Sequence, residues 1–385
     1  NFMQKPMEAP FVFGKIASAE NFTDRNDETL RLVQNFRSSV NTIIISPRRW
    51  GKSSLVEHAS RSAARSNRDI RFCMVDLNNV RTEEHFYEYY ATAVMRSSFS
   101  RAKELLENTT RLLGRFMPNV TFSPGPGSTF SLSMNWKEVM KTPDDILDLP
   151  QKIAGERKKK IVVCIDEFQN ISAFTDPLGF QKKLRSHWQR HNMVSYCLYG
   201  SKRHMMIDVF ASPSMPFYKF GDIIFLEKIA AGDWIPYIRR RFAATGKGIA
   251  TEDARLITEL TDCHPYYVQQ LARQAWLRTE TECSRVVIIR SFDDLVLQMS
   301  MLFQTLTDSL SNTQVNFLHA MIRGEEKFSS QDTAIKFGLG TPGNVTKIKN
   351  ALVSREVIDI AGGKPCFLDP VYKAWLTRYY FRTAD

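Results

Sequence analysis

The chain has 385 residues, 43% of them hydrophobic, and it carries 52 Lys+Arg against 41 Asp+Glu, a formal net charge of +11. This length exceeds what one hydrophobic core usually supports, so we expect two or three domains. The charge favours a polyanionic partner such as nucleic acid, or an anionic membrane surface, with a merely soluble basic surface as the alternative.

The cysteine pattern excludes two classes of site. The six cysteines contain no C-x-x-C pair, and Cys73, Cys164 and Cys197 fall inside predicted buried strands. A metal site or a disulfide framework would need clustered spacing, so we expect reduced thiols.

No apolar run approaches the ~18 residues of a membrane span. Residues 1–10 lack a basic region followed by an apolar stretch, so we expect no membrane partner and a cytoplasmic location.

The first two hundred or so residues alternate short apolar strands with amphipathic helices. This alternation is typical of a parallel sheet covered by helices on both faces. The predicted strands cover about Asn41 to Ile45, Arg71 to Asp76, Lys160 to Asp166, Val194 to Gly200 and Ile223 to Leu226. The predicted helices cover Ser53 to Ser66, Glu83 to Phe99, Leu178 to His191 and Lys202 to Ala211. We therefore predict an α/β core over residues 1–228.

An alternating apolar and polar segment interrupts this core at about residues 118–133. It surrounds a Pro/Gly turn and predicts a β-hairpin, either a covered edge hairpin or an interaction arm.

Two further domains are predicted after the core. Helices at Asp233 to Ala244, Thr251 to Cys263, Pro265 to Leu277 and Phe292 to Leu310 indicate a helical lid over residues 229–310. Beyond it, helices at Thr313 to Ile322, Ser330 to Phe337 and Pro342 to Ser354 precede strands at Val357 to Ala361 and Pro365 to Leu368. Three helices and a glycine-turned hairpin are typical of a winged helix, which we predict over residues 311–385.

A phosphate-binding loop follows the first strand. Except for Ser46 in place of the first glycine, the segment fits the P-loop pattern: Ser46, Pro47, Arg48, Arg49, Trp50, Gly51, Lys52 and Ser53, with Ser54 next. In this motif backbone N–H groups and a helix N-terminus face the phosphates, and the lysine approaches the β/γ oxygens. The Ser53 hydroxyl is predicted to reach Mg²⁺. A side chain at Gly51 would block close approach.

A second strand supplies two carboxylates. Asp166 and Glu167 end the apolar run that begins at Ile161. Asp166 is predicted to hold Mg²⁺, since Mg²⁺ binds carboxylates while keeping much of its hydration shell. Glu167 is predicted to polarise the attacking water, with a surface carboxylate at the strand end as the alternative. Ser201, or the nearby Lys202 and Arg203, after the fourth strand, is predicted to sense the γ-phosphate.

These motifs resemble the archaeal-type ATPase family, within the STAND signalling ATPases and related to the AAA+ proteins. The resemblance covers nearly the whole chain. It includes Phe22-Thr23-Asp24-Arg25, like a family segment near the adenine, and Gly200-Ser201 with Arg203, like the family's sensor segment. Cys263-His264-Pro265 resembles a lid element whose proline approaches the base, so the resemblance adds Phe22, Arg25 and Pro265 to the nucleotide site.

The resemblance implies a strand order of 5-1-4-3-2, binding of ATP or ADP with Mg²⁺, and either slow hydrolysis as a switch or ATP-driven assembly. Two positions depart from the family pattern. Ser46 replaces the first P-loop glycine, and Cys263 stands where the lid element often has glycine. Neither residue takes part in the phosphate chemistry. We therefore expect ATP binding to be retained and the rate of ATP hydrolysis to be affected.

The predicted winged helix offers candidate DNA contacts. Pro342 is preset for an early position of its third helix. Thr346, Lys347, Lys349 and Asn350 on that helix suit phosphates and base edges, and Lys364 at the wing tip suits the backbone. The alternative is a winged helix that docks within the chain or onto a protein.

Two function hypotheses follow. The first is an ATP-hydrolysing switch in which the bound nucleotide sets the position of the winged helix. The second is a DNA-binding protein, with a mobile element as a candidate source, for which ATP is an assembly or structural ligand. A protein scaffold with an inactive nucleotide site is disfavoured by Lys52, Ser53, Asp166 and Glu167. A small-molecule kinase is disfavoured by the large lid and the winged-helix tail.

Overall fold

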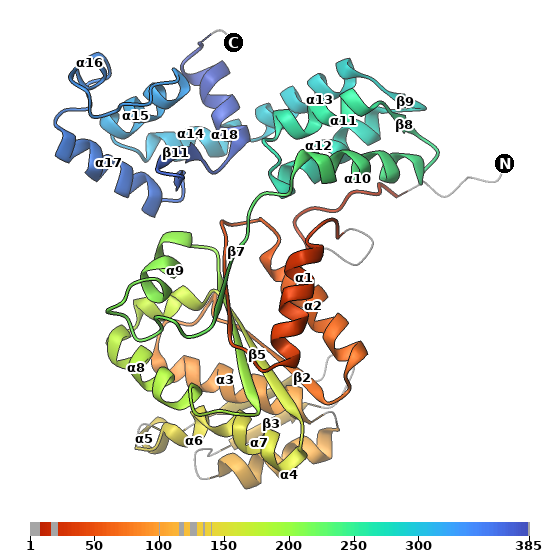
Figure 1. Ribbon diagram of the computed structural model, residues 1–385, viewed down its shortest axis with the longest axis vertical. Coiled ribbons are helices and arrows are strands. Elements are labelled where there is room, and N and C mark those ends of the chain that lie inside the picture. The colour runs from red at the N-terminus through yellow and green to blue at the C-terminus, as the bar shows by residue number, and fades with distance from the viewer. Residues whose placement is uncertain are drawn as a thin grey trace. The chain divides into compact units, whose positions relative to one another are not determined.

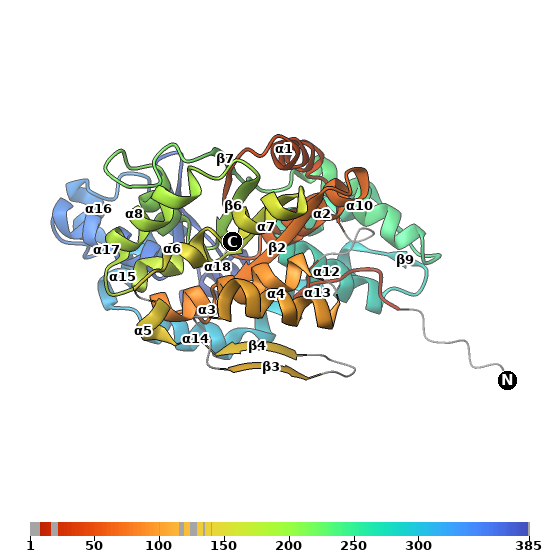
Figure 2. The ribbon, with the colours of Figure 1, turned by 90° about the horizontal axis from the view of Figure 1, so that it is seen from below.

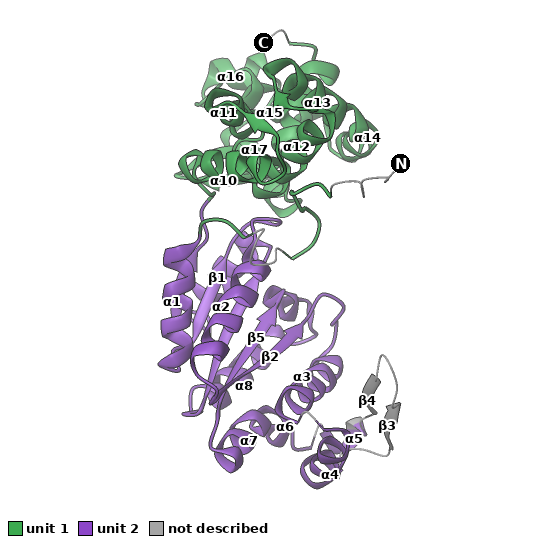
Figure 3. Ribbon diagram, turned by 90° about the vertical axis from the view of Figure 1, so that its right-hand side faces the viewer, with its two compact units in different colours: residues 1–24, 228–385 green, residues 25–227 purple. Residues whose placement is uncertain are grey.

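The computed structural model describes residues 8–16, 22–99, 101–114, 119–123, 129–133, 135–139 and 141–383. The chain divides into two compact units (Figure 3). Residues 25–227 form the sheet unit, and residues 1–24 together with 228–385 form the helical unit. The division of the chain into a lid over 229–310 and a winged helix over 311–385 stays a prediction.

The sheet unit is built on a parallel sheet of five strands in the order β2-β5-β6-β1-β7. Figure 1 labels β2, β5 and β7 of this sheet. The strands are β1 (Thr42–Ile45), β2 (Ile70–Asp76), β5 (Lys160–Asp166), β6 (Val194–Gly200) and β7 (Asp222–Phe225). These are the strands that the apolar runs predict. Counted among themselves, they stand in the predicted order 5-1-4-3-2, which is confirmed.

Helices cover both faces of this sheet. On one face, Ile43 and Ile45 share a core with buried residues of α3 (Glu83–Ser98), α7 (Leu149–Arg157), α8 (Pro177–Trp188) and α9 (Arg203–Phe210). On the other, Phe36 of α1 (Asn26–Arg37) meets Phe72 of β2, with ring centroids 5.2 Å apart. α2 (Lys52–Ser66) packs beside α1. β1, β5 and β6 are buried along nearly their whole length, on both faces of the sheet, which explains why these segments are mostly apolar.

Local signals set where these helices begin. The Thr82 side chain accepts a hydrogen bond from His85 N, which caps α3, and Asp176 caps α8 ahead of Pro177. The remaining helices of the unit are α4 (Ala102–Leu113), α5 (Trp136–Val139), α6 (Asp144–Leu147) and the 3₁₀ helix η2 (Phe168–Ala173).

The interruption near residue 120 contains an antiparallel pair, β3 (Asn119–Ser123) with β4 (Thr129–Ser133) (Figure 2). These strands lie within the predicted hairpin. Pro118 and the Pro/Gly turn at 124–128 lie outside the described residues.

The first helices of the helical unit are α10 (Ala231–Ala243), α11 (Thr251–Leu260), α12 (Pro265–Arg278), α13 (Arg285–Gln298) and α14 (Ser300–Asp308). The prediction of one helix from Phe292 to Leu310 is wrong, because the chain turns at Met299 between α13 and α14. The prediction of helices alone also missed a parallel pair of two-residue strands, β8 (Gly248–Ile249) and β9 (Glu282–Cys283).

The chain continues with α15 (Asn312–Ile322), α16 (Gln331–Lys336), α17 (Pro342–Ser354), β10 (Ile358–Ala361), β11 (Lys364–Phe367), α18 (Pro370–Trp375) and the π-helix η3 (Leu376–Tyr380). β10 and β11 pair antiparallel. This is the order of elements that the winged-helix prediction requires.

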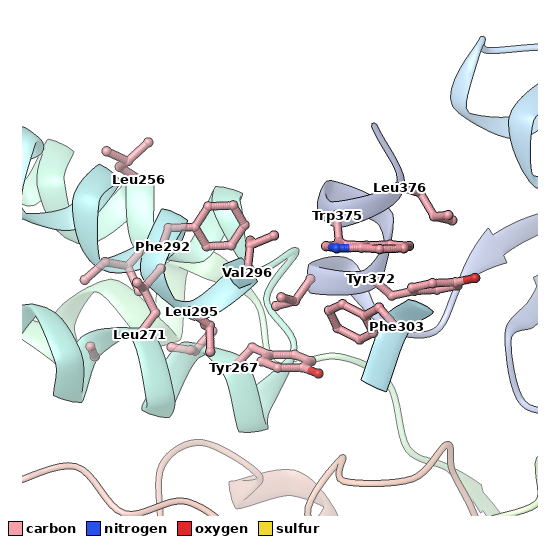
Figure 4. Close-up of a cluster of buried hydrophobic side chains, with 14 of the residues drawn as sticks. Leu256, Tyr267, Leu271, Phe292, Leu295, Val296, Phe303, Tyr372, Trp375 and Leu376 are labelled. Atoms are coloured by element: carbon pink, nitrogen blue, oxygen red, sulfur yellow. The ribbon is translucent and has the colours of Figure 1, made fainter. Parts of the chain in front are cut away.

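Buried side chains join these parts of the helical unit into one core (Figure 4). Phe292 and Val296 of α13 pack beside Tyr267 and Leu271 of α12. Phe303 of α14 instead meets Tyr372, with ring centroids 5.2 Å apart. Across the described part of the chain, none of the helices combines the length and the hydropathy needed to cross a bilayer.

Candidate nucleotide site

The predicted P-loop lies between β1 and α2 at the carboxyl end of the sheet. Arg49 and Gly51 have φ of 64° and 89°, in the left-handed region that favours glycine. Gly51 directly precedes α2 and has no side chain with which to cap it. The first-turn N–H groups of α2 are therefore suited to an anion, since a helix N-terminus attracts negative charge.

The register of the sheet brings the predicted motifs to one edge. Ile45 at the end of β1 pairs with Gly200 at the end of β6, and Ile165 of β5 pairs with Leu198 of β6. β6 therefore lies between the P-loop strand and the strand that ends in Asp166. Residues that follow all three strands emerge at the same edge, as expected for parallel strands.

Four predicted site residues meet there. Ser53 Oγ donates to Asp166 Oδ2 over 2.9 Å. Lys52 Nζ lies 3.5 Å from Glu167 Oε1, and the two side chains are 8% and 18% exposed. The hydroxyl, the ammonium and the two carboxylates thus share one partly buried site.

Glu167 is held by more than the lysine. Its φ of 53° places it in the left-handed region. Its Oε2 accepts hydrogen bonds from Ser201 Oγ at 2.9 Å, from Ser201 N at 3.3 Å and from Gln169 Nε2. Ser201 thus contacts Glu167, and the sequence did not indicate this contact. Gln169 was missed, although its position two residues after Glu167 was a possible signal.

The two carboxylates differ in acidity. Burial raises the pKa of Asp166, and Lys52 and Ser53 offset only part of this effect. Burial alone would also raise the pKa of Glu167, but Lys52, Gln169 and Ser201 outweigh it, so this pKa is lowered. Both effects follow from the low local dielectric and the donors that surround each group.

These residues fit a Mg²⁺-nucleotide. Ser53 Oγ and Asp166 Oδ2 are adjacent oxygens of the kind that Mg²⁺ binds, directly or through water. The Lys52 ammonium is almost fully buried beside them at the start of α2, where a phosphate would meet it. Glu167 provides a carboxylate within the same site.

The other residues predicted in the P-loop occupy varied environments. Ser46 is buried, and its hydroxyl donates to the Pro47 carbonyl at 3.1 Å. Arg48 and Arg49 are exposed, and Trp50 and Ser54 are half-buried. Arg203 is the first residue of α9, just beyond Ser201. Roles for these residues in nucleotide binding stay predictions.

Arg25 has an environment that the sequence did not suggest. It is 4% exposed, and its guanidinium donates to Glu28 Oε1 at 2.9 Å and to the carbonyl of Glu227. Residue 25 begins the sheet unit and residue 227 ends it. Arg25 therefore ties together the two points where the chain leaves this unit, and the role near the adenine that the resemblance implied stays a prediction.

Phe22 and Pro265 belong to the helical unit, so their part in the nucleotide site stays a prediction. Pro265 is the first residue of α12. Cys263, two residues before Pro265, has a φ of 53°, in the region that favours glycine, which explains why glycine would suit the same position.

The predicted DNA-contacting residues lie on α17 and at the start of β11. Thr346, Lys347 and Asn350 are exposed on α17. Lys349 Nζ instead lies 5.3 Å from the centroid of the Phe328 ring. Lys364 Nζ contacts Glu326 Oε1 at 2.7 Å, in a pair whose side chains are both about 70% exposed.

No family model and no curated protein sequence matches the chain. Solved structures resemble it. A Walker-type ATPase of Pyrococcus abyssi has a TM-score of 0.62 at 16% identity, over 93% of this chain and 97% of that one. The ORC2 protein of Aeropyrum pernix, in ADPNP-ADP complexes, has a TM-score of 0.57 at 13% identity, over 94% of each chain.

The ORC1 protein of Aeropyrum pernix, in complex with DNA, has a TM-score of 0.50 at 13% identity, over 97% of this chain and 99% of that one. At such identities the likeness concerns the fold. The chain therefore has the fold of the archaeal Walker-type ATPases and ORC proteins, which is consistent with the resemblance to the archaeal-type ATPase family.

Proposed function

We propose that the protein is a Mg²⁺-dependent ATPase of the archaeal-type family, within the STAND class, that converts ATP to ADP and phosphate. One observation carries this proposal. Lys52, Ser53, Asp166 and Glu167 meet at the carboxyl edge of a parallel sheet, at the N-terminus of α2. The fold shared with Walker-type ATPases supports it.

Each residue has a defined task in this proposal. Mg²⁺ would neutralise phosphate charge and orient the triphosphate, held by Ser53 and Asp166. Lys52 would bind the β/γ-phosphate oxygens, together with the first-turn N–H groups of α2. Glu167 would accept a proton from the attacking water as general base. Ser201 fixes the carboxylate of Glu167 through two donors.

Two single variants test the assignment. Lys52→Ala should abolish ATP binding, because it removes the buried ammonium that faces the phosphates. Glu167→Gln should keep ATP binding and lose hydrolysis, because an amide cannot accept the proton. Binding is measured by calorimetric titration and turnover by phosphate release. Suitable controls are Lys182→Ala and Glu156→Gln, on exposed faces of α8 and α7. Intact turnover in Glu167→Gln would remove this residue from its role.

The ATPase is proposed to act as a cytoplasmic switch that couples nucleotide state to the winged helix. The support lies in the connection between the units. The chain crosses between them at residues 24–25 and again at 227–228, and Arg25 joins the two crossings. Asp24 and Arg25 both have positive φ, 56° and 68°, as at a defined turn. The two connections between the units therefore meet at a hydrogen bond within the sheet unit.

A sizing column run with ADP and with a non-hydrolysable ATP analogue tests the switch. If the protein elutes at different volumes with ADP and with the ATP analogue, its shape or assembly has changed, because the two runs differ only in the nucleotide. Identical elution, confirmed by small-angle scattering, would contradict a switch of this kind.

Duplex DNA is the second candidate partner, with ATP as an assembly or structural ligand. It is favoured by the exposed Thr346, Lys347 and Asn350 on α17, a helix followed by an antiparallel hairpin, and by the net charge of +11. Side chains of this kind on a helix suit phosphates and base edges in a major groove.

The salt dependence of DNA binding tests this candidate. Lys347→Ala with Lys349→Ala should reduce the slope of log affinity against log salt by about 0.9 for each phosphate that a lysine no longer neutralises. Lys373→Ala, on an exposed position of α18, is the matched control. Absence of duplex binding at low salt would exclude the DNA hypothesis and leave a protein-docking role for this region.

A further inference from the structure

We infer that Gln169 is a positioning residue that holds Oε2 of Glu167, so that Oε1 is the oxygen presented to the reacting water. This inference rests on the proposed ATPase function and adds to it the orientation of the general base. Gln169 does not touch the nucleotide or the water in this assignment, and it acts through Glu167.

The two carboxylate oxygens of Glu167 have unequal partners. Oε2 accepts from Gln169 Nε2, from Ser201 Oγ at 2.9 Å and from Ser201 N at 3.3 Å. Oε1 has the ammonium of Lys52 at 3.5 Å, longer than a good hydrogen bond. If Lys52 turns to a phosphate, Oε1 gives up this partner while Oε2 keeps its donors. The carboxylate then has one fixed oxygen and one available oxygen.

The environment of Gln169 favours this role over space filling. Gln169 is 1% exposed, and its Oε1 is a buried acceptor with no hydrogen bond among the described residues. An unpaired buried amide oxygen destabilises the fold, because it gives up its hydrogen bond to water and gains none in return. An apolar side chain of the same length would avoid that cost, so stability alone does not explain a glutamine here. The donor to Glu167 is what the amide adds.

The backbone around Gln169 is also fixed. Gln169 belongs to η2, and the neighbouring Asn170 anchors this helix by donating from Nδ2 to the Leu77 carbonyl at 2.9 Å. Glu167 precedes η2 with a positive φ, a strained conformation that is typical of functional sites. The amide therefore reaches Glu167 from a rigid support.

Gln169→Met tests the inference, because methionine matches the length of glutamine and donates nothing. We expect kcat for ATP hydrolysis to fall roughly 10- to 100-fold, since a misplaced catalytic group costs about that much. KM and the calorimetric affinity for ATP should stay within about twofold, because Gln169 contacts no phosphate in this assignment. A merely structural defect would not separate kcat from KM in this way.

The matched control is Gln181→Met in α8. Gln181 is 2% exposed, and its side chain makes no hydrogen bond to Glu167 in the part of the chain that the structure describes. This variant should keep both kcat and KM. Gln169→Glu is a second probe of the same shape, in which an acceptor replaces the donor facing Glu167, and its kcat should fall at least as far as that of Gln169→Met.

A combined variant tests whether the effect passes through Glu167. Gln169→Met with Ser201→Ala removes the side-chain donors to Oε2 and should approach the turnover of Glu167→Gln without falling below it. Unchanged kcat in Gln169→Met, in a chain whose wild type hydrolyses ATP, would overturn the positioning role alone. A wild-type chain that binds no ATP would instead overturn the proposed function and this inference with it.

Discussion

Gly200 lies so close to Gln169 that a Cβ built on the glycine would stand 1.8 Å from Oε1 of the glutamine and 2.9 Å from Sδ of Met206. Gly200 is the last residue of β6 and Gln169 follows β5, so neighbouring strands bring them together. Only a residue without a side chain leaves room for the amide that contacts Glu167. Steric exclusion by Gln169 thus explains why the predicted sensor segment has a glycine at position 200.

The first prediction concerns this close approach. Gly200→Ala should displace Gln169 and lower the kcat of ATP hydrolysis by about the factor found for Gln169→Met, with little change in KM. Overpacking at a buried position should also cost about 1–3 kcal/mol of the free energy of unfolding. Phosphate release and urea denaturation measure the two effects. Gly232→Ala is the control, since an added Cβ there meets nothing within 4 Å.

The second prediction concerns backbone conformation in the P-loop. Gly51 has a φ of 89° with open space around an added Cβ, so Gly51→Ala should suffer from strain and not from a clash. The left-handed region costs a non-glycine residue about 1–2 kcal/mol, which should appear in the free energy of unfolding. ATP binding should also fall, because a methyl group would hinder close approach of a phosphate.

A glycine-to-alanine substitution in α7 should change the free energy of unfolding in the opposite direction. Gly155 is an exposed helical residue with nothing within 4 Å of an added Cβ and no positive φ. Gly155→Ala should raise the free energy of unfolding by about 0.5–1 kcal/mol, because glycine loses more backbone entropy in a helix than alanine. Equal effects of the two substitutions would contradict the assignment of strain to Gly51.

The strands were predictable because short, mostly apolar runs, such as Ile43 to Ile45 and Ile161 to Ile165, end in polar turns. Their order was available only from the resemblance, since apolar runs carry no information about neighbours. The close approach of Gly200 to Gln169 could not be predicted, because it depends on the register between β5 and β6. The hydrogen bond from Arg25 to the Glu227 carbonyl joins residues 202 positions apart, so the local sequence pattern could not predict it.

The break between α13 and α14 was missed for a related reason. Apolar residues, Phe292 and Phe303 among them, recur at helical spacing through this segment, so the sequence predicts one helix. In the structure they pack against different partners, and Phe303 meets Tyr372 and Trp375 with centroids 5.2 and 6.0 Å apart. Tertiary packing decides the direction of the chain at Met299, and propensity does not.

The third prediction concerns the metal. Ser53→Ala removes the hydroxyl that lies 2.9 Å from Asp166 Oδ2. Affinity for ATP in the presence of Mg²⁺ should fall by about 10- to 100-fold, the usual cost of losing a group that supports a metal site. Affinity measured in EDTA should change much less. Ser66→Ala is the control, because among the hydrogen bonds of the described residues this hydroxyl at the far end of α2 donates to the Ala63 carbonyl. Equal losses with and without Mg²⁺ would contradict a role of Ser53 at the metal.

The fourth prediction concerns pH and a cluster of hydrogen bonds away from the nucleotide site. Asp148 Oδ1 contacts His187 Nδ1 at 2.8 Å and His191 Nε2 at 3.0 Å, and His191 Nδ1 contacts the Tyr196 hydroxyl at 2.8 Å. Burial lowers the pKa of His191, although Asp148 opposes this effect. Burial would raise the pKa of Asp148, but its hydrogen bonds to His191 and His187 outweigh it, so this pKa is lowered.

Both shifts make the fold less stable in acid. Because the pKa of His191 is lower in the folded state, the unfolded chain takes up the proton first, near its ordinary value of about 6.5. The stability due to neutral His191 is therefore complete above about pH 6.5 and is lost as the pH falls below it. The contribution of Asp148 is present above its ordinary value of about 3.9 and is lost at lower pH. Urea denaturation from pH 7.5 to 5 should show a falling free energy of unfolding in the wild type, and a flatter dependence in His191→Gln, whose side chain does not titrate. An equally steep fall in that variant would assign the acid sensitivity to other groups.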